Sequence, residues 1–372
     1  MKITDVEAIY LRLPDVKAQT DSGQDALIVR ISTDEGITGI GEVDSAPLAV
    51  KGVIEGPFSH NITSGLRELL IGEDPFETEY LWYKMYRKNV YAARRGIGIH
   101  AMSGIDIALW DIKGKALGQP IWKLLGGGFH EKIRPYASVL FGATPDETRE
   151  RAQRFRDQGF TAVKFGWEPM GEDEKTDIAL VREARKGLGD DADLMIDAGL
   201  VWDAKTAIQR ARAFADYNIF WLEEPLAPDD YDGYRKLSEA THLRIAAGEE
   251  ESNRLSYIEL MDRGKVDIVQ IDLTRVGGFT EAMKIASLAV DRSLPVANHG
   301  FTTYINVAAA LHFLNSVPNS FICEFVVEEE TTLRDQITKQ RIVAQDGFVE
   351  IPNEPGLGVE LNNDTIHKYR VA

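Results

Sequence analysis

One unit recurs along the sequence from about residue 132 onward, a short run rich in β-branched and aromatic residues followed by an amphipathic helical segment. Eight such runs begin between 24 and 33 residues apart, at Ile133–Val139, Thr161–Phe165, Leu194–Asp197, Ile219–Glu223, Leu243–Ala247, Asp267–Ile271, Leu294–Ala297 and Phe321–Cys323. This spacing accommodates one strand, one helix and two loops. The pattern therefore predicts an α/β fold of the (β/α) TIM-type barrel class, with its chemistry at the C-terminal ends of the strands.

An open, doubly wound sheet is the alternative architecture for alternating strands and helices. Such a sheet usually carries a glycine-rich phosphate loop after its first strand, and the stretch 139–142 (Val-Leu-Phe-Gly) does not supply one. The barrel is therefore the favoured interpretation.

The pattern of predicted strands and helices divides the chain into three parts. Residues 1–125 read as an α+β domain, with alternating strand patterns at Thr4–Leu13 and Ala26–Thr33 and a helical pattern at Ile97–Leu117. The barrel is expected over residues 126–340. The tail, residues 341–372, is punctuated by proline and glycine, and we expect it to leave the barrel and return to the N-terminal domain.

Composition narrows the possible partners and the compartment. The chain has 42 Lys and Arg against 59 Asp and Glu, a net charge of −17, which argues against nucleic acid and anionic membranes. Its one cysteine, Cys323, excludes an intramolecular disulfide and a cysteine-based zinc site. No apolar run is long enough to span a membrane, and the first ten residues lack a signal-peptide pattern, so we expect a cytoplasmic protein.

Carboxylates end three successive predicted strands. Asp197, Glu223 and Glu249 are each preceded by an apolar run and lie 26 residues apart. Three carboxylates that converge on one barrel mouth repel one another unless a cation lies between them, and hard oxygen ligands suit Mg²⁺ better than zinc. Because adjacent strand residues point to opposite faces, only one of Glu223 and Glu224 can share this orientation, and the even spacing favours Glu223.

Four further ionisable residues end other strands. Asp272 and His299 end neighbouring strands, and a carboxylate held against one imidazole nitrogen leaves the other nitrogen free to transfer protons. Glu324 ends the last strand. Lys164 ends the second, where it could neutralise a substrate carboxylate, act as a base, or simply extend its ammonium group to solvent.

In these residues the chain resembles the enolase superfamily, and within it the mandelate racemase subgroup, over essentially its whole length. The resemblance rests on residues in a fixed order: Lys164, Asp197, Glu223, Glu249, Asp272, His299, Glu324 and the ending Pro352–Gly358. It implies a modified barrel with an N-terminal capping domain that the tail completes. It also implies that the three carboxylates bind Mg²⁺, and that Lys164 and a protonated Glu324 stabilise the dianion formed when the proton alpha to a carboxylate is removed. We expect the pKa of Glu324 to be raised.

One departure from the family pattern bears on the reaction. Family members usually carry Lys-x-Lys at the second strand, and here that stretch is Lys164-Phe165-Gly166. A racemase needs an acid–base group on each face of the intermediate, so the missing lysine favours a hydro-lyase that converts an aldonic or aldaric acid to a 2-keto-3-deoxy acid. A racemase or epimerase of a 2-hydroxy acid remains the alternative. Whether His299 or Lys164 abstracts the proton stays open.

The residues that select the substrate are expected in the capping domain and beside the barrel mouth. The polar stretch 15–24 resembles a lid, and Lys17, Gln19 and Thr20 lie within it. Arg95, before the long helix, and Trp167, after the second strand, are further candidates for contact with a small acid sugar. A homo-oligomer is the default for an enzyme of this size.

Overall fold

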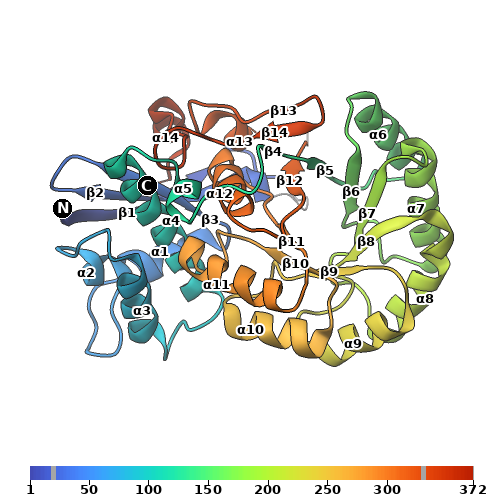
Figure 1. Ribbon diagram of the computed structural model, residues 1–372, viewed down its shortest axis with the longest axis horizontal. Helices are drawn as coiled ribbons and strands as arrows, with labels where there is room; N and C mark the ends of the chain where they lie inside the picture. Colours follow the sequence, from blue (N-terminus) through green and yellow to red (C-terminus); the bar gives the residue numbers. More distant parts are fainter. Residues whose placement is uncertain (18–21, 328–331, 372) are drawn as a thin grey trace.

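A computed structural model describes residues 1–17, 22–327 and 332–371. The N-terminal part contains an antiparallel sheet in the order β1-β2-β3, with α4 packed against it (Figure 1). Its elements are β1 (Ile3–Arg12), β2 (Asp25–Thr33), β3 (Thr38–Val43), α1 (Pro47–Glu55), α2 (Leu66–Leu70), α3 (Thr78–Asn89) and α4 (Ile97–Leu117). The predicted strands and the predicted long helix are therefore present. We call this part the cap.

Glycines allow α4 to lie close to the cap sheet. A Cβ atom on Gly41 of β3 would lie 2.0 Å from the carbonyl oxygen of Gly104 in α4, so any other residue there would force the helix away. The helix ends at Gly118, whose left-handed backbone (φ 62°) allows its amide to bond back to the last turn. The close packing brings the acidic side chains of α4 within reach of neighbouring elements.

Eight parallel strands form the barrel, in the order β11-β10-β9-β8-β7-β6-β5-β12. They are β5 (Pro135–Leu140), β6 (Ala162–Gly166), β7 (Asp193–Asp197), β8 (Ile219–Glu223), β9 (Ile245–Ala247), β10 (Ile268–Ile271), β11 (Val296–Asn298) and β12 (Cys323–Val326). An isolated parallel bridge links Val296 of β11 to Ser320, three residues before β12, and so brings the two ends of this sheet together. The predicted barrel is confirmed, and each predicted strand lies within a few residues of its expected position.

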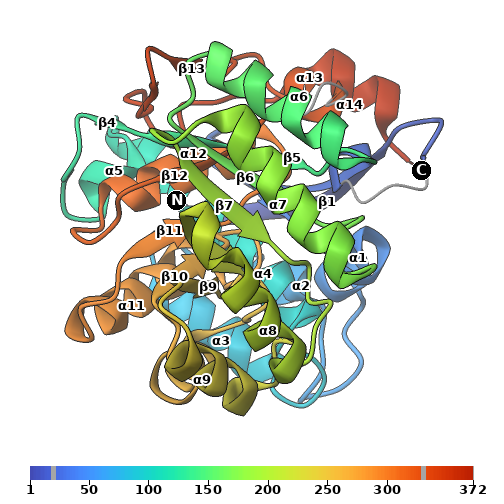
Figure 2. The same cartoon turned by 90° about the vertical axis from the view of Figure 1, so that its right-hand side faces the viewer.

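Helices follow the strands and cover the outside of the barrel (Figure 2). They are α6 (Pro145–Asp157), α7 (Glu174–Leu188), α8 (Ala204–Phe214), α9 (Tyr231–Ala240), α10 (Arg254–Glu259), α11 (Gly278–Asp291), α12 (Tyr304–Asn315) and α13 (Thr332–Gln336). A short helix, α5 (Ile121–Leu124), lies between the cap and the barrel in sequence. Helices α6 to α10 begin with a side-chain cap from their own N-cap residue, whereas α11 follows Gly277 and has none.

The two ends of the barrel interior differ in chemistry. Aromatic and aliphatic side chains, including Tyr136 and Trp221, fill the end nearer the strand N-termini, where the two rings pack edge to face at 5.3 Å. Buried charged side chains follow at the C-terminal ends of the strands. Apolar packing at the N-terminal ends of the strands and charged groups at their C-terminal ends are the arrangement expected of a barrel enzyme.

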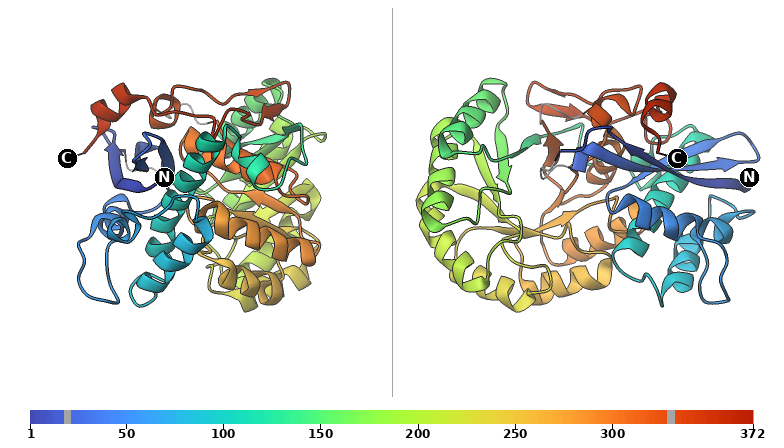
Figure 3. Two further views of the ribbon diagram at one scale, coloured as in Figure 1. Left: turned by 60° about the vertical axis from the view of Figure 1, so that its left-hand side comes forward. Right: turned by 180° about the vertical axis from the view of Figure 1, so that it is seen from behind.

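The C-terminal segment contacts both other parts of the chain (Figure 3). Its strands β13 (Ala344–Gln345) and β14 (Phe348–Glu350) form a small sheet with β4 (Lys132–Ile133), which directly precedes β5. Farther on, α14 (Asn363–Tyr369) contacts β1, and the amide of Val371 donates to the carbonyl oxygen of Tyr10. Across the described residues, no helix is both long and apolar enough to cross a membrane.

Candidate active site

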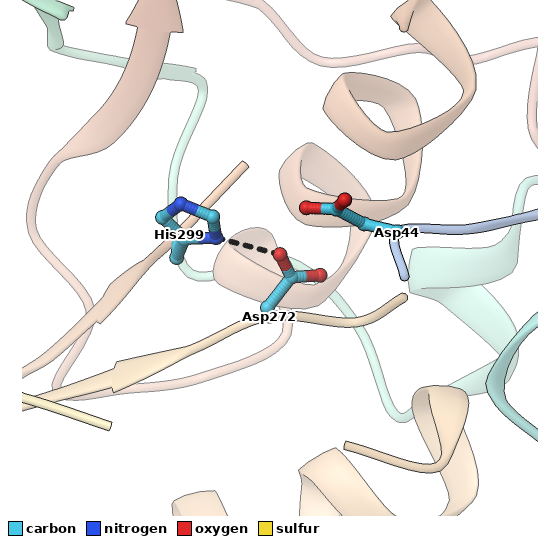
Figure 4. Close-up of side chains that lie close together, drawn as sticks. All are labelled: Asp44, Asp272 and His299. Atoms are coloured by element: carbon cyan, nitrogen blue, oxygen red, sulfur yellow. Dashed lines mark hydrogen bonds and ion pairs between the residues drawn. The ribbon is translucent and has the colours of Figure 1, made fainter. Parts of the chain in front are cut away.

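The His299 ring and the Asp272 carboxylate are hydrogen-bonded at the barrel mouth (Figure 4). The distance from Nδ1 to Oδ2 is 2.6 Å, and both side chains are buried. The other Asp272 oxygen accepts from the amide and the hydroxyl of Thr274 at 2.7 and 2.6 Å. Burial raises the pKa of Asp272, but the bond from His299 and its charge outweigh that effect and hold the pKa below its ordinary value. The carboxylate therefore accepts from Nδ1 and leaves Nε2 as the outward-facing nitrogen.

Nε2 of His299 lies 3.3 Å from Oε1 of Glu249. Burial alone would lower the pKa of the imidazole, but the carboxylates of Glu249 and Glu324 outweigh burial and raise it to about 10. The protonation state of this histidine therefore depends on whether the charge of Glu249 is compensated by another cation.

The Lys164 ammonium lies among three carboxylates. It pairs with Glu223, with Glu324 at 2.7 Å and with Asp197 at 3.8 Å, and its side chain is almost fully buried. Burial lowers the pKa of the ammonium, but Glu223 and Glu324 raise it well above its ordinary value. Lys164 is thus a permanent cation in this arrangement, and it does not extend to solvent.

Glu324 differs from our expectation. Oε1 accepts from the Ser138 hydroxyl and the Lys164 ammonium, both at 2.7 Å, and Oε2 accepts from the Gly300 amide at 2.7 Å. Burial raises the pKa of Glu324, but the charges of Lys164 and His299 and these bonds bring it below its ordinary value. The expected rise in the pKa of Glu324 is therefore wrong, because every neighbour that contacts its carboxylate is a donor.

The carboxylates predicted to bind a metal are all buried, and burial raises the pKa of each: Asp197, Glu223 (to about 8) and Glu249 (to about 6). Glu223 also accepts a bond from the Trp221 indole at 2.8 Å. Glu224, in a left-handed conformation (φ 37°), lies instead beside Glu249 and Glu250, with carboxylate oxygens within 4.8 Å of one another. Both Glu223 and Glu224 therefore lie close to other carboxylates of the site.

The buried charges at the mouth do not balance. Seven carboxylates lie there with two permanent cations and one histidine: Asp44, Asp197, Glu223, Glu224, Glu249, Asp272 and Glu324 against Lys164, Arg275 and His299. Buried carboxylates of this number require a further cation or bound protons. Their oxygens are the ligands that Mg²⁺ prefers, so the donor set fits that ion.

A pocket of about 200 Å³ opens onto these groups. It is lined by Ser138, Val139, Leu140, Lys164, Gly166, Trp167, Asp197, Glu249, Arg275, His299, Phe301 and Glu324. Of the expected substrate contacts that the structure describes, Trp167 lines this pocket, whereas Lys17 and Arg95 do not. Arg95 is exposed and acts electrostatically on Glu251 and Tyr231. Gln19 and Thr20 lie outside the described residues.

Arg275 and Asp44 are site residues that the sequence interpretation missed. The Arg275 guanidinium donates to Asp44 of the cap at 2.7 Å and pairs with Glu249 at 3.4 Å and Asp272 at 3.8 Å. Arg275 could have been found from its position three residues after Asp272, on a loop at the barrel mouth. Asp44 follows a cap strand, and no local pattern reveals how the cap docks on the barrel.

Two family models together match most of the chain. The model described as the mandelate racemase/muconate lactonizing enzyme N-terminal domain matches residues 4–126, and the one described as enolase C-terminal domain-like matches residues 147–365. Both matches have the order expected for a cap followed by a barrel.

Characterised relatives and a solved structure extend this match. The chain is 33% identical to D-galactarolactone cycloisomerase of Agrobacterium fabrum over 93% of this chain and 91% of the relative. It is 34% identical to D-galactonate dehydratase of Pectobacterium atrosepticum over 91% and 90%. The crystal structure of 3,6-anhydro-D-galactonate cycloisomerase from Zobellia galactanivorans superposes with a TM-score of 0.90 at 34% identity, over the full length of both chains.

Proposed function

We propose, from the premise that this chain belongs to the mandelate racemase/muconate lactonizing enzyme family of the enolase superfamily, that it is a Mg²⁺-dependent acid-sugar dehydratase. The reaction removes the proton alpha to the carboxylate of an aldonic or aldaric acid. His299, which has taken the alpha proton, returns it to the β-hydroxyl, which leaves as water, and the resulting enol becomes a 2-keto-3-deoxy acid. Relatives named as dehydratases of galactonate, gluconate and arabinonate support this reaction class.

One observation carries the proposal: His299, hydrogen-bonded to Asp272, lines the same pocket as Lys164 and the buried carboxylates Asp197, Glu249 and Glu324. Mg²⁺ held by Asp197, Glu223 and Glu249 would supply the positive charge that stabilises the second negative charge on the substrate carboxylate and that offsets Glu249 beside His299. The chain's own residues provide the rest of the chemistry.

Each of these residues has a distinct role in the proposal. His299 is the base, because Nε2 faces the pocket and Asp272 fixes the other nitrogen. Lys164 remains an ammonium and stabilises the substrate carboxylate as charge develops, which argues against Lys164 as the base. Glu324 acts as an ionised acceptor that orients Lys164 and the Gly300 amide.

A racemase or epimerase is less well supported. Such an enzyme needs a second acid–base group opposite His299, and at the end of β6 that place is occupied by Gly166. A Cβ atom on Gly166 would lie 2.9 Å from Cβ of Asp197, so this position is also filled by its neighbour. Elimination can proceed with one acid–base group, which takes the alpha proton and returns it to the leaving hydroxyl, and His299 of the pocket meets that requirement.

Ring opening is a second candidate, favoured by the cycloisomerase names of two similar proteins. When the β-oxygen belongs to a ring, the same proton abstraction expels it without loss of water, and the product is an isomer of the substrate. The pocket wall formed by Leu140, Trp167 and Phe301 is apolar and suits the C–H face of a ring.

Proton NMR in D₂O tests the proposal with purified protein, Mg²⁺ and a library of aldonic acids, aldaric acids and their lactones and anhydro forms. Signals of a 2-keto-3-deoxy product one water lighter than its substrate support dehydration. An isomeric ring-opened product supports the cycloisomerase. Loss of the alpha-proton signal without a new skeleton identifies a racemase or epimerase and contradicts both eliminations.

A further inference from the structure

The cap domain supplies the missing N-terminal cap of barrel helix α11. Oδ2 of Asp106, on cap helix α4, accepts from the amide of Thr280 in the first turn of α11 at 2.9 Å. The N-terminal domain also holds the turn before α11, because the amide of Gly277 donates to the hydroxyl of Ser103, on α4, at 2.7 Å. A buried carboxylate from another domain thus does what an N-cap side chain usually does.

Helix α12 receives a similar contact from the end of β3. Oε2 of Glu42 accepts from the amide of Asn306, in the first turn, at 3.0 Å, and from the hydroxyl of the N-cap residue Thr303 at 2.7 Å. Thr303 also accepts from the amide of Ile305, so residue 303 is held from both sides. All of these groups are buried.

The two capped helices follow the two loops that carry the His–Asp pair. Asp272 and Gly277 are five residues apart, and the turn between them is closed by bonds from the amides of Arg275 and Val276 to the Asp272 carbonyl oxygen. His299 and Thr303 are four residues apart. A displacement at either helix start is therefore transmitted directly to one partner of the 2.6 Å bond.

Each carboxylate also has one oxygen without a partner in the described part of the chain, Oε1 of Glu42 and Oδ1 of Asp106. A buried, unpaired carboxylate oxygen costs free energy, so stability alone does not explain an acid at these positions. A role in positioning does. We propose that Glu42 and Asp106 are positioning residues that reach out of the cap to hold the loops of His299 and Asp272 in the geometry of their hydrogen bond.

Truncation of each acid tests the inference with a matched control. Glu42→Ala and Asp106→Ala remove the carboxylates of the N-terminal domain that bond to the first turns of α12 and α11. Asp111→Ala removes the other buried acid of α4, which accepts from the amides of Ile40 and Leu357 but contacts neither loop. Glu42→Gln and Asp106→Asn keep an accepting oxygen and are the conservative rescues.

The first readout needs no substrate. The Nδ1 proton shared between His299 and Asp272 should give a far-downfield ¹H resonance, assigned by its absence in His299→Asn. Glu42→Ala and Asp106→Ala are expected to shift or broaden this signal, whereas Asp111→Ala, Glu42→Gln and Asp106→Asn retain it. If both truncations leave the signal unchanged, or if Asp111→Ala perturbs it equally, the inference is wrong.

The second readout is kinetic and rests on the proposed function. A displaced base lowers kcat about tenfold to a hundredfold with KM little changed, while Asp111→Ala stays within about twofold. Equal kcat values for the truncations and the control contradict the inference. If no library compound is turned over by the unmodified enzyme while the NMR result holds, the proposed function fails and the positioning role stands.

Should Glu42→Ala not fold, Thr303→Val removes the same hydroxyl contact from the barrel side, with the same expected and contradicting results.

Discussion

Nδ1 of His299 lies 2.6 Å from Oδ2 of Asp272, although the two residues follow different strands, β11 and β10. The bond exists because these strands are paired in the sheet, with Ile271 opposite Asn298. Residues that directly follow paired parallel strands emerge at the same edge, so the pairing brings the two side chains together. The positions of His299 and Asp272 are thus set by the register of the barrel.

His299→Asn tests the base. The amide can still donate or accept near Asp272, so we expect the fold and Mg²⁺ binding to be retained while kcat falls by about 10²- to 10⁴-fold, the usual contribution of a general base. Circular dichroism, titration calorimetry with Mg²⁺ and steady-state kinetics measure the three quantities. Retained turnover would place the base elsewhere.

Glu223→Gln and Glu224→Gln form a matched pair for the metal site. The two changes are chemically identical and one residue apart, but we expect Glu223→Gln to weaken Mg²⁺ binding by at least about tenfold more than Glu224→Gln, because it removes a proposed direct ligand. Calorimetric dissociation constants decide the order. The opposite order would assign the site to Glu224, which lies beside Glu249.

The local chemistry of the site was predictable from the sequence, and its long-range packing was not. Eight strand patterns, seven of them ending in an ionisable residue such as Lys164 or Glu249, indicate a barrel mouth before any coordinates are known. The pKa of Glu324 was predicted in the wrong direction, since its donors come from three different segments: Ser138, Lys164 and Gly300. The contact of Asp44 with Arg275 depends on how the cap docks on the barrel, and no sequence periodicity in either segment predicts that arrangement.

Gly166→Ala tests how tightly the mouth is packed. A Cβ atom there would lie 2.9 Å from Cβ of Asp197 and 3.1 Å from its Oδ2. The carboxylate must move away, so we expect Mg²⁺ affinity to fall several-fold while the apolar end of the barrel is unaffected. Calorimetry measures the affinity, and Gly52→Ala, at an open position in α1 of the cap, controls for loss of a glycine. Unchanged affinity would show that Asp197 is not a ligand.

The stability of the metal-free protein should fall as the pH rises, in part through Glu42. Burial raises the pKa of Glu42 from its ordinary 4.5 to about 8. A carboxyl whose pKa is raised by folding contributes stability that is present below pH 4.5 and lost as the pH rises toward 8, at about 1.4 kcal/mol per pKa unit. Urea unfolding with EDTA at several pH values should therefore show a shallower decline for Glu42→Gln than for the unmodified protein. Parallel curves would contradict the raised pKa.

Lys164→Met should make folding depend strongly on metal. The change leaves the buried carboxylates of Glu223, Glu324 and Asp197 without their shared ammonium, and breaking a buried pair by removing one partner typically costs about 3–5 kcal/mol. Mg²⁺ bound by the proposed ligands would restore part of that charge balance and would stabilise the native state by mass action. We therefore expect a larger rise in Tm on addition of MgCl₂ for the variant than for the unmodified protein, measured by calorimetric scans with and without EDTA.

Lys339→Met, which removes an exposed pair with Glu360, serves as the control and should respond to Mg²⁺ like the unmodified protein. Equal responses of all three proteins would mean that Lys164 and the metal do not compensate the same carboxylates.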